Sequence, residues 1–292
     1  MTINDSPDVD CRSVTATFSD GTIVKARLII GCDGSRSRVR QLLISDDAVS
    51  SPTTTPYTIL NFPCSYPATI ATELRAIHPV FKVAYHPKLN CMYMLSVLDT
   101  STSATSGAIT FQNLISWKGP PYTSDIHADP SLALKHLQKL GAQFAPPFST
   151  AAANIPDDTK LFVDQGTQWD PRPHFAVSHD PHSGTRSTSW NARPSTERTI
   201  TLAGDAAHSM LPHRGQGLNH SLEDAAKLVS ALKAVFRDRT RSLADAVAAY
   251  EEEMVRRGGA EIEVTAKAAA TAHDWGLMMQ SPIFKHGANK VR

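Results

Sequence analysis

Two aspartates in this chain follow runs of strand-forming residues, and each has a glycine beside it. The run 28–30 leads to Asp33-Gly34, and the run 199–202 leads to Gly204-Asp205. Ligands of open α/β sheets bind at the carboxyl ends of strands, where both aspartates should lie. A carboxylate there accepts hydrogen bonds from hydroxyl groups, so it suits a sugar or ribityl chain better than a phosphate. The pair predicts one ligand that is held from two sides.

Two further glycines, Gly215 and Gly217, stand directly before a helical pattern. Backbone N–H groups approach a ligand closely at glycine, and a helix N-terminus carries about half a positive charge. We therefore expect an anion or an electron-rich ring edge at this helix start. The helix should bury one stripe of apolar residues that recur at spacings of three and four: Leu218, Leu222, Ala225, Val229, Leu232 and Phe236.

Alternation and turn residues predict the elements around the first aspartate. Residues 14–18 alternate as a strand, Asp20-Gly21 forms a hairpin turn, and residues 23–30 return as a strand with a buried apolar end. Ser37 should cap the helix that follows, and Cys32 is interpreted as a buried apolar residue. Three arginines of this helix are equally compatible with phosphate contacts and with a solvated helix face: Arg36, Arg38 and Arg40.

The middle of the chain has the pattern of a β-rich region. Residues 45–56 have the composition of a linker. Breaks of Pro, Asn, Ser and Gly separate four predicted strands of a mostly antiparallel sheet, at 57–62, 80–85, 92–98 and 108–117. Six residues of these strands could line an aromatic pocket, although such residues more often form plain core: Tyr57, Phe62, Tyr85, Met92, Met94 and Trp117.

Two further helices are predicted outside the central strands, and residues 141–198 form a Pro-rich and polar segment. A helix is expected at 130–140, and a last one should begin at Ser242. Gly258-Gly259 is expected to break that last helix. The polar segment contains His174, His179 and His182, whose irregular spacing among turn residues does not predict a metal site.

Composition excludes several classes of function. The chain has 292 residues, of which 41% are hydrophobic and 20% charged, as in globular proteins. A formal net charge of +1 gives no reason to expect nucleic acid or a membrane surface as a partner. No run of eighteen apolar residues and no signal peptide are found, so we expect no membrane span and a cytoplasmic protein. The cysteines are scattered, which predicts neither a zinc site nor a disulfide framework: Cys11, Cys32, Cys64 and Cys91.

Both aspartate segments resemble motifs of a known family. The segment 204–225 contains GDAAH, Pro212, Gly215-Gln216-Gly217, Asn219 and Glu223-Asp224-Ala225. It resembles the second flavin-binding motif of the FAD-dependent aromatic hydroxylases, the para-hydroxybenzoate hydroxylase-like monooxygenases. The segment 31–40 is similar to the Asp-Gly motif of the same enzymes. The resemblance implies an α/β fold with an incomplete, Rossmann-like FAD-binding domain at 1–50 and 190–292, and an inserted β-rich substrate domain at 51–189.

The resemblance also implies a function. Such enzymes use FAD, NAD(P)H and O₂ to transfer one oxygen atom to an aromatic or polyketide-like small molecule, and such a step would suit secondary metabolism. It assigns cofactor binding to these residues: Asp205, Gly215, Gly217, Leu218, Asn219, Asp33, Gly34 and Pro212. No catalytic side chain is identified, and a structural hydrogen-bonding role is preferred for His208 over acid or base catalysis.

One part of the family pattern does not occur in this sequence. The family holds the ADP half of FAD at a G-x-G-x-x-G turn that follows the first strand, and no such turn is present. A separate chain could supply that portion. Alternatively, the chain is a non-catalytic remnant of a flavoprotein that acts as a binding or interaction module.

Overall fold

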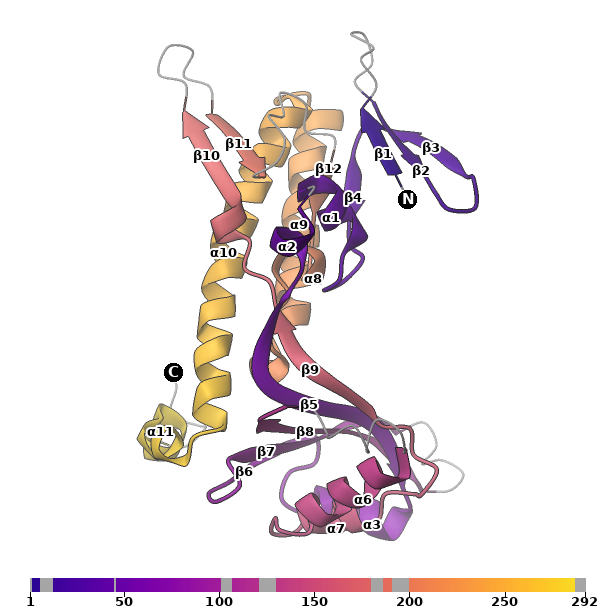
Figure 1. Cartoon of the computed structure of the whole chain (residues 1–292), viewed down its shortest axis with the longest axis vertical. Helices are drawn as coiled ribbons and strands as arrows, with labels where there is room; N and C mark the ends of the chain where they lie inside the picture. Colours follow the sequence, from indigo (N-terminus) through magenta and orange to yellow (C-terminus); the bar gives the residue numbers. More distant parts are fainter. Residues whose placement is uncertain are drawn as a thin grey trace. The chain divides into compact units, whose positions relative to one another are not determined.

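A computed structural model of the chain describes residues 2–5, 13–44, 46–100, 107–120, 130–179, 186–190 and 200–286. These residues form two compact units (Figure 1). The first comprises residues 1–54 and 167–268, and the second comprises residues 55–166 and 269–292. These limits differ from the expected domain boundaries at 167–189 and 269–292. The assignment of the parts to cofactor and substrate stays a prediction.

The first unit is built around a pair of parallel strands. Strand β4 (Ile29–Gly31) pairs with β12 (Ile200–Leu202), so that Gly31 lies opposite Leu202. Gly31 is required because a Cβ there would lie 2.7 Å from the Cβ of Val39. Helix α1 (Arg38–Ile44) begins directly after the β4 loop, and its residues Val39 and Leu43 join the core of this unit. The two aspartate segments therefore leave neighbouring strands at the same end, as the sequence predicts.

The expected single strand at 23–30 is wrong. The chain forms β3 (Ile23–Ala26) and then β4, and the two strands belong to different sheets. Strand β3 pairs with β2 (Val14–Thr17), which also pairs with β1 (Thr2–Asp5). The expected burial at the end of this run is also wrong, because Ile30 is 39% exposed. Its side chain lines an open pocket, since β12 is the one described neighbour of β4.

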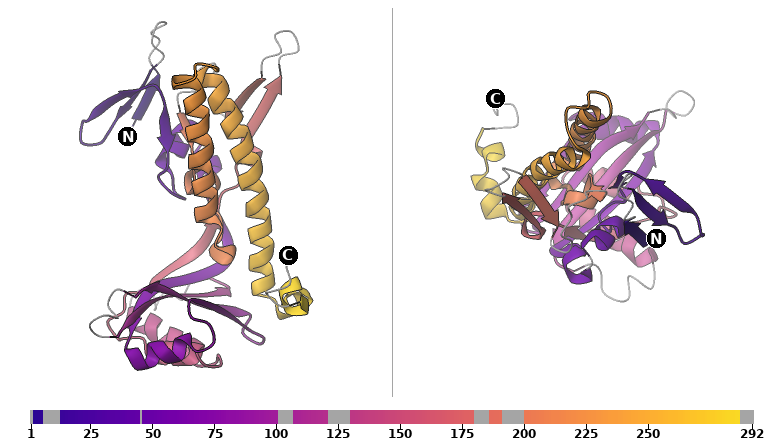
Figure 2. Two further views of the ribbon diagram at one scale, coloured as in Figure 1. Left: turned by 180° about the vertical axis from the view of Figure 1, so that it is seen from behind. Right: turned by 90° about the horizontal axis from the view of Figure 1, so that it is seen from above.

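Helix α9 (Gly217–Phe236) does not bury the predicted stripe. Leu218, Leu222 and Val229 are 70%, 60% and 51% exposed, and Phe236 is 47% exposed. The buried face instead contains Asp224 and Leu228, because α10 (Leu243–Ala272) packs against that face (Figure 2). The spacing of apolar residues predicted the helix correctly but did not predict which of its faces is buried.

Helix α10 runs without a break through Gly258-Gly259, so the predicted helix end is wrong. The two glycines provide space for side chains instead. A Cβ on Gly258 would lie 2.7 Å from the His208 ring, and one on Gly259 would overlap Cδ of Arg172. The start of α10 agrees with the prediction, because the Ser242 hydroxyl accepts a hydrogen bond from the Asp245 N–H and donates one to the Asp245 carboxylate.

The second unit contains a five-stranded sheet in the order β6-β7-β8-β5-β9. Its strands are β5 (Thr53–Tyr66), β6 (Phe81–His86), β7 (Cys91–Asp99), β8 (Ile109–Lys118) and β9 (Phe162–Gln168). The four predicted strands are confirmed, and their mutual pairings are antiparallel. One face is covered by α3 (Ala68–Arg75), α6 (Pro130–Gly141) and α7 (Phe148–Ala153) (Figure 1).

Two segments expected to be irregular contain regular structure. The expected linker 45–56 forms α2 (Asp47–Ser50) and the start of β5, and Asp46 caps that helix. The segment 141–198 contains α7, β9, a short 3₁₀ turn (Arg172–His174) and a hairpin of β10 (Phe175–His179) and β11 (Arg186–Trp190). Propensity is weak in such segments, and tertiary packing decides their conformation.

The C-terminal residues of the second unit cover part of the other sheet face. Helices α11 (Trp275–Gln280) and α12 (Pro282–His286) follow His273. Met92 and Leu114 pack there with Met278, and Phe62 is fully buried on the helix-covered face. His273 is buried, stacks on Tyr57 and lies 2.9 Å from the Ser116 hydroxyl. The core interpretation of these aromatic and methionine residues therefore holds for Phe62 and Met92.

Candidate functional site

Asp205 begins a short turn that leaves the end of β12. This turn, α8 (Asp205–His208), exposes Asp205 and buries Ala206, Ala207 and His208. The preceding Gly204 has φ 61° and ψ −143°, a conformation that favours glycine. A Cβ on Gly204 would lie 2.9 Å from Oγ of Ser221 on α9. The turn is therefore packed closely on α9 and presents one carboxylate to solvent.

Asp33 lies at the end of β4 and uses its oxygens locally. Oδ2 accepts hydrogen bonds from the backbone N–H of Arg38 and of Val39, at 2.7 and 3.1 Å, and Oδ1 accepts one from Ser37 Oγ. Burial would raise the pKa of Asp33, but these hydrogen bonds outweigh it and lower the pKa. Asp33 thus caps α1. Ser37 takes part in the same cap, as expected, since its Oγ accepts from the Arg40 N–H.

Arg40 fits neither role expected for it, because its side chain is fully buried. The guanidinium donates to the backbone oxygens of Ser35, Ser50 and Ala206 and lies 4.6 Å from the centre of the Trp169 ring. Burial lowers its pKa to about 10. Arg40 therefore ties the loop after Asp33 to the turn that carries Asp205. In contrast, Arg36 and Arg38 are exposed.

The glycine segment lies beside Asp205. A Cβ on Gly217 would be 3.8 Å from Asp205 Oδ1. Gly215 has a left-handed conformation (φ 64°), and neither it nor Gly34 has an atom within 4 Å of where a Cβ would be. Both backbones are thus open to a ligand. Pro212, Leu218 and Asn219 are exposed, and Asn219 donates to the Gln216 side chain.

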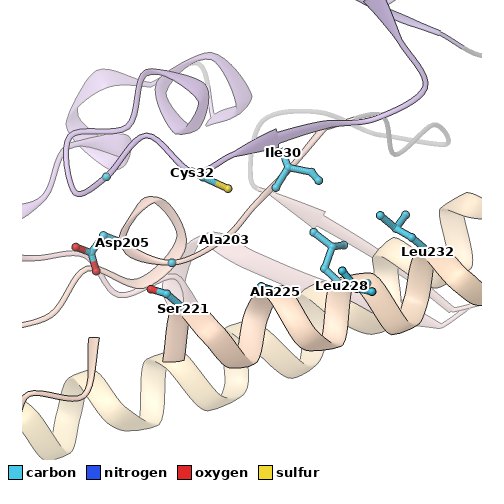
Figure 3. Close-up of a pocket in the computed structure, with 11 residues that line it drawn as sticks. Ile30, Cys32, Ala203, Asp205, Ser221, Ala225, Leu228 and Leu232 are labelled. Carbon is cyan, nitrogen blue, oxygen red and sulfur yellow. The ribbon is translucent and has the colours of Figure 1, made fainter. Parts of the chain in front are cut away.

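A pocket of about 480 Å³ lies between the two strand ends and α9 (Figure 3). Its polar end contains Cys32, Asp205 and Ser221, and its apolar end contains Ile30 and Leu232. Cys32 is exposed there, so its interpretation as a buried residue is wrong. The polar end, with the exposed carboxylate of Asp205 and glycine backbones, fits a polyhydroxyl chain. The apolar end fits apolar side chains.

Behind the turn lies a cluster of buried and partly buried polar side chains that the sequence did not reveal. Asp224 and His208 are both 0% exposed, and Asp224 Oδ1 accepts from Arg257 at 2.5 Å. Burial would raise the pKa of Asp224, but its hydrogen bonds with His208 and Arg257 lower it. Asp224 stands in the segment that resembles the second flavin-binding motif, but its spacing there does not indicate its burial or its partners. The buried, hydrogen-bonded His208 agrees with the structural role preferred for it.

Across the described ranges, no group of three or more His, Cys, Asp and Glu residues is arranged to hold a metal ion. His182 lies outside these ranges. None of the helices described here combines the length and apolar character that crossing a bilayer needs.

Comparison with known proteins agrees with this geometry. Residues 171–263 match the family model described as FAD binding domain. FAD-dependent monooxygenase cctM of Talaromyces islandicus is 31% identical over 283 residues, which is 96% of this chain and 64% of that protein. FAD-dependent monooxygenase phnB of Penicillium herquei is 30% identical over 94% of this chain and 62% of its own length.

The resemblance to the FAD-dependent hydroxylases is confirmed. Klebsiella pneumoniae HpxO, solved with FAD and uric acid, has a TM-score of 0.69 at 19% identity. The likeness covers 97% of this chain and 61% of HpxO. The 2,6-dihydroxypyridine-3-hydroxylase of Arthrobacter nicotinovorans has a TM-score of 0.67 at 18% identity, over 93% of this chain and 64% of that one. These likenesses establish the α/β flavin hydroxylase fold. The chain spans slightly less than two thirds of each relative named here.

Proposed function

We propose that this chain is the ring- and ribityl-binding part of an FAD-dependent monooxygenase. The enzyme would use NAD(P)H and O₂ to oxygenate an aromatic or polyketide-like small molecule, in keeping with the fungal relatives. The observation that carries the proposal is the exposed carboxylate of Asp205, which lies beside Gly217 in the same glycine segment as the open backbone of Gly215.

The residues of this chain would mainly bind and orient the cofactor. Asp205 would accept hydrogen bonds from ribityl hydroxyls, and the backbone of 215–218 would face the polar edge of the flavin ring. Asn219 and Pro212 would border the same ligand. Asp33 and Gly34 would support it from the end of the other strand, β4. Bound FAD would supply the redox chemistry and the activation of O₂.

Binding of riboflavin tests this proposal directly, because riboflavin has the ring and ribityl chain but no phosphate. We expect weak binding with a dissociation constant of about 0.1–1 mM, measured by quenching of flavin fluorescence. Asp205→Asn should weaken it about tenfold, because cofactor hydroxyls would lose a charged acceptor. Asp238→Asn, on an aspartate remote from the turn in sequence, serves as the control. Equal affinity in the wild type and Asp205→Asn would remove Asp205 from the site.

A segment from a separate chain would complete the pocket. Parallel strands occur in sheets that are buried on both faces, yet β4 has one described neighbour and Ile30 is 39% exposed. A strand, G-x-G-x-x-G turn and helix would cover this edge and hold the ADP half of FAD. Co-expression with such a segment should yield a complex that retains FAD on gel filtration. Val229→Asp, at the apolar end of the pocket, should abolish that complex.

A further inference from the structure

Asp224 lies behind the turn that carries Asp205 and binds both of its ends. Its Oδ2 accepts hydrogen bonds from the Gly204 N–H and from His208 Nε2–H, each at 2.7 Å. Asp205 is the exposed residue of the segment between these two donors. We propose that Asp224 is a positioning residue that fixes Asp205 for cofactor binding. The inference rests on the proposed function, in which Asp205 contacts the flavin.

The first end of the turn depends on Gly204. Its backbone, at φ 61° and ψ −143°, directs the N–H to the Asp224 carboxylate. Other residue types rarely adopt this conformation, and the contact with Ser221 leaves no room for a side chain. The hydrogen bond to Asp224 therefore stabilises the conformation that turns the chain outward at Asp205.

The second end depends on His208. The ring is fully buried against Gly258, where a side chain would overlap it. Nδ1 has no hydrogen-bond partner among the described residues, so Nε2 provides the polar contact that orients the ring. Removal of the Nε2–H donor should release this end of the turn.

The hydrogen bonds with His208 and Arg257 lower the pKa of Asp224 and so keep the acceptor ionised. Arg257 is a multiple donor. It donates to Asp224 Oδ1, to Glu253 and, at 2.9 Å, to Nδ1 of His220. An ionised carboxylate can accept several hydrogen bonds at once, which the two ends of the turn and Arg257 require. Because Asp224 is completely buried, it would act on the ligand through the turn and not by contact.

Hydrogen exchange of the flavin-free full chain, followed by mass spectrometry, tests the positioning. His208→Leu removes the donor, whereas His208→Gln places an amide N–H near the position of Nε2. We expect the amides of 203–209 to exchange about tenfold faster in His208→Leu and near the wild-type rate in His208→Gln. Asp224→Asn should also accelerate this exchange. Glu223→Gln, at the adjacent and exposed carboxylate, should leave it unchanged.

Riboflavin titration of the same proteins tests the connection to Asp205. His208→Leu should weaken binding about tenfold, and it should add little to Asp205→Asn because both changes remove the same contact. Additive losses would overturn the proposal, as would wild-type exchange rates in both His208→Leu and Asp224→Asn. If wild-type protein binds no riboflavin, the proposed function fails, while exchange still decides whether Asp224 and His208 fix the turn.

Discussion

At the scale of single residues, buried partners explain features that look anomalous in the sequence. Arg40 is a fully buried cation that binds backbone oxygens, and the glycine pair in α10 is a packing site and not a helix end. In both cases a residue distant in sequence makes the contact that requires this residue type. Substitutions at such positions should reveal that neighbour.

The two glycines of α10 provide a matched pair of substitutions. Gly258→Ala should destabilise the protein by about 1–3 kcal/mol, because its Cβ would overlap the fully buried His208 ring, which is held by its hydrogen bond to Asp224. Gly259→Ala should change stability by less than about 1 kcal/mol, because the Arg172 side chain is 42% exposed and can shift. Both changes gain similar helix propensity. Urea unfolding measures the difference, and equal losses would contradict it.

At the scale of elements, α9 shows that an apolar stripe need not be the buried face. The buried residues of the helix are Asp224 and Leu228. Several residues of the predicted apolar stripe remain exposed to solvent. This orientation follows from the ion pairs and packing with α10.

Truncation of two leucines on α9 tests this orientation. Leu228→Ala should cost about 2–4 kcal/mol, because Leu228 is 5% exposed and packs in the core of the first unit. Leu222→Ala should change stability by less than about 0.5 kcal/mol, since Leu222 is 60% exposed. Thermal or urea unfolding of the two variants provides the comparison. The opposite ranking would mean that the predicted stripe is buried after all.

At the scale of the whole molecule, a buried and a half-buried histidine should make stability depend on pH. Burial is the main cause that lowers the pKa of His273 in the second unit and of His220 in the first. Neighbouring Arg257 and His208 lower the pKa of His220 further. The unfolded chain then binds more protons than the folded chain below the ordinary histidine pKa of about 6.5. Stability should be fully present above this pH and fall as the pH decreases below it.

The size of this dependence can be measured with one substitution. Each histidine kept neutral in the folded state contributes up to about 1.4 kcal/mol per pH unit between its folded pKa and about 6.5. His273→Gln should therefore flatten the dependence of the urea midpoint on pH between about 5.5 and 7. His78→Gln, on an exposed histidine, is the control. An unchanged slope in His273→Gln would show that His273 is not kept neutral by burial.

The sequence by itself determined the features whose cause is local. The Asp-Gly and Gly-Asp strand ends, the Ser37 and Ser242 caps and the strands of the central sheet depend on residues within a few positions of one another. The flavin hydroxylase fold was predictable because its motif residues stand in a fixed order. The helical period likewise identified α9.

The tertiary structure alone decided what depends on distant partners. It determined which face of α9 is buried, why α10 continues through Gly258-Gly259, and where strand 23–30 divides between two sheets. It also brought Asp224, His208 and Arg257 together behind Asp205 from three separate helices. These hydrogen bonds join residues that are far apart in sequence and close in the folded chain. The spacing of neighbouring residues in the sequence therefore does not predict them.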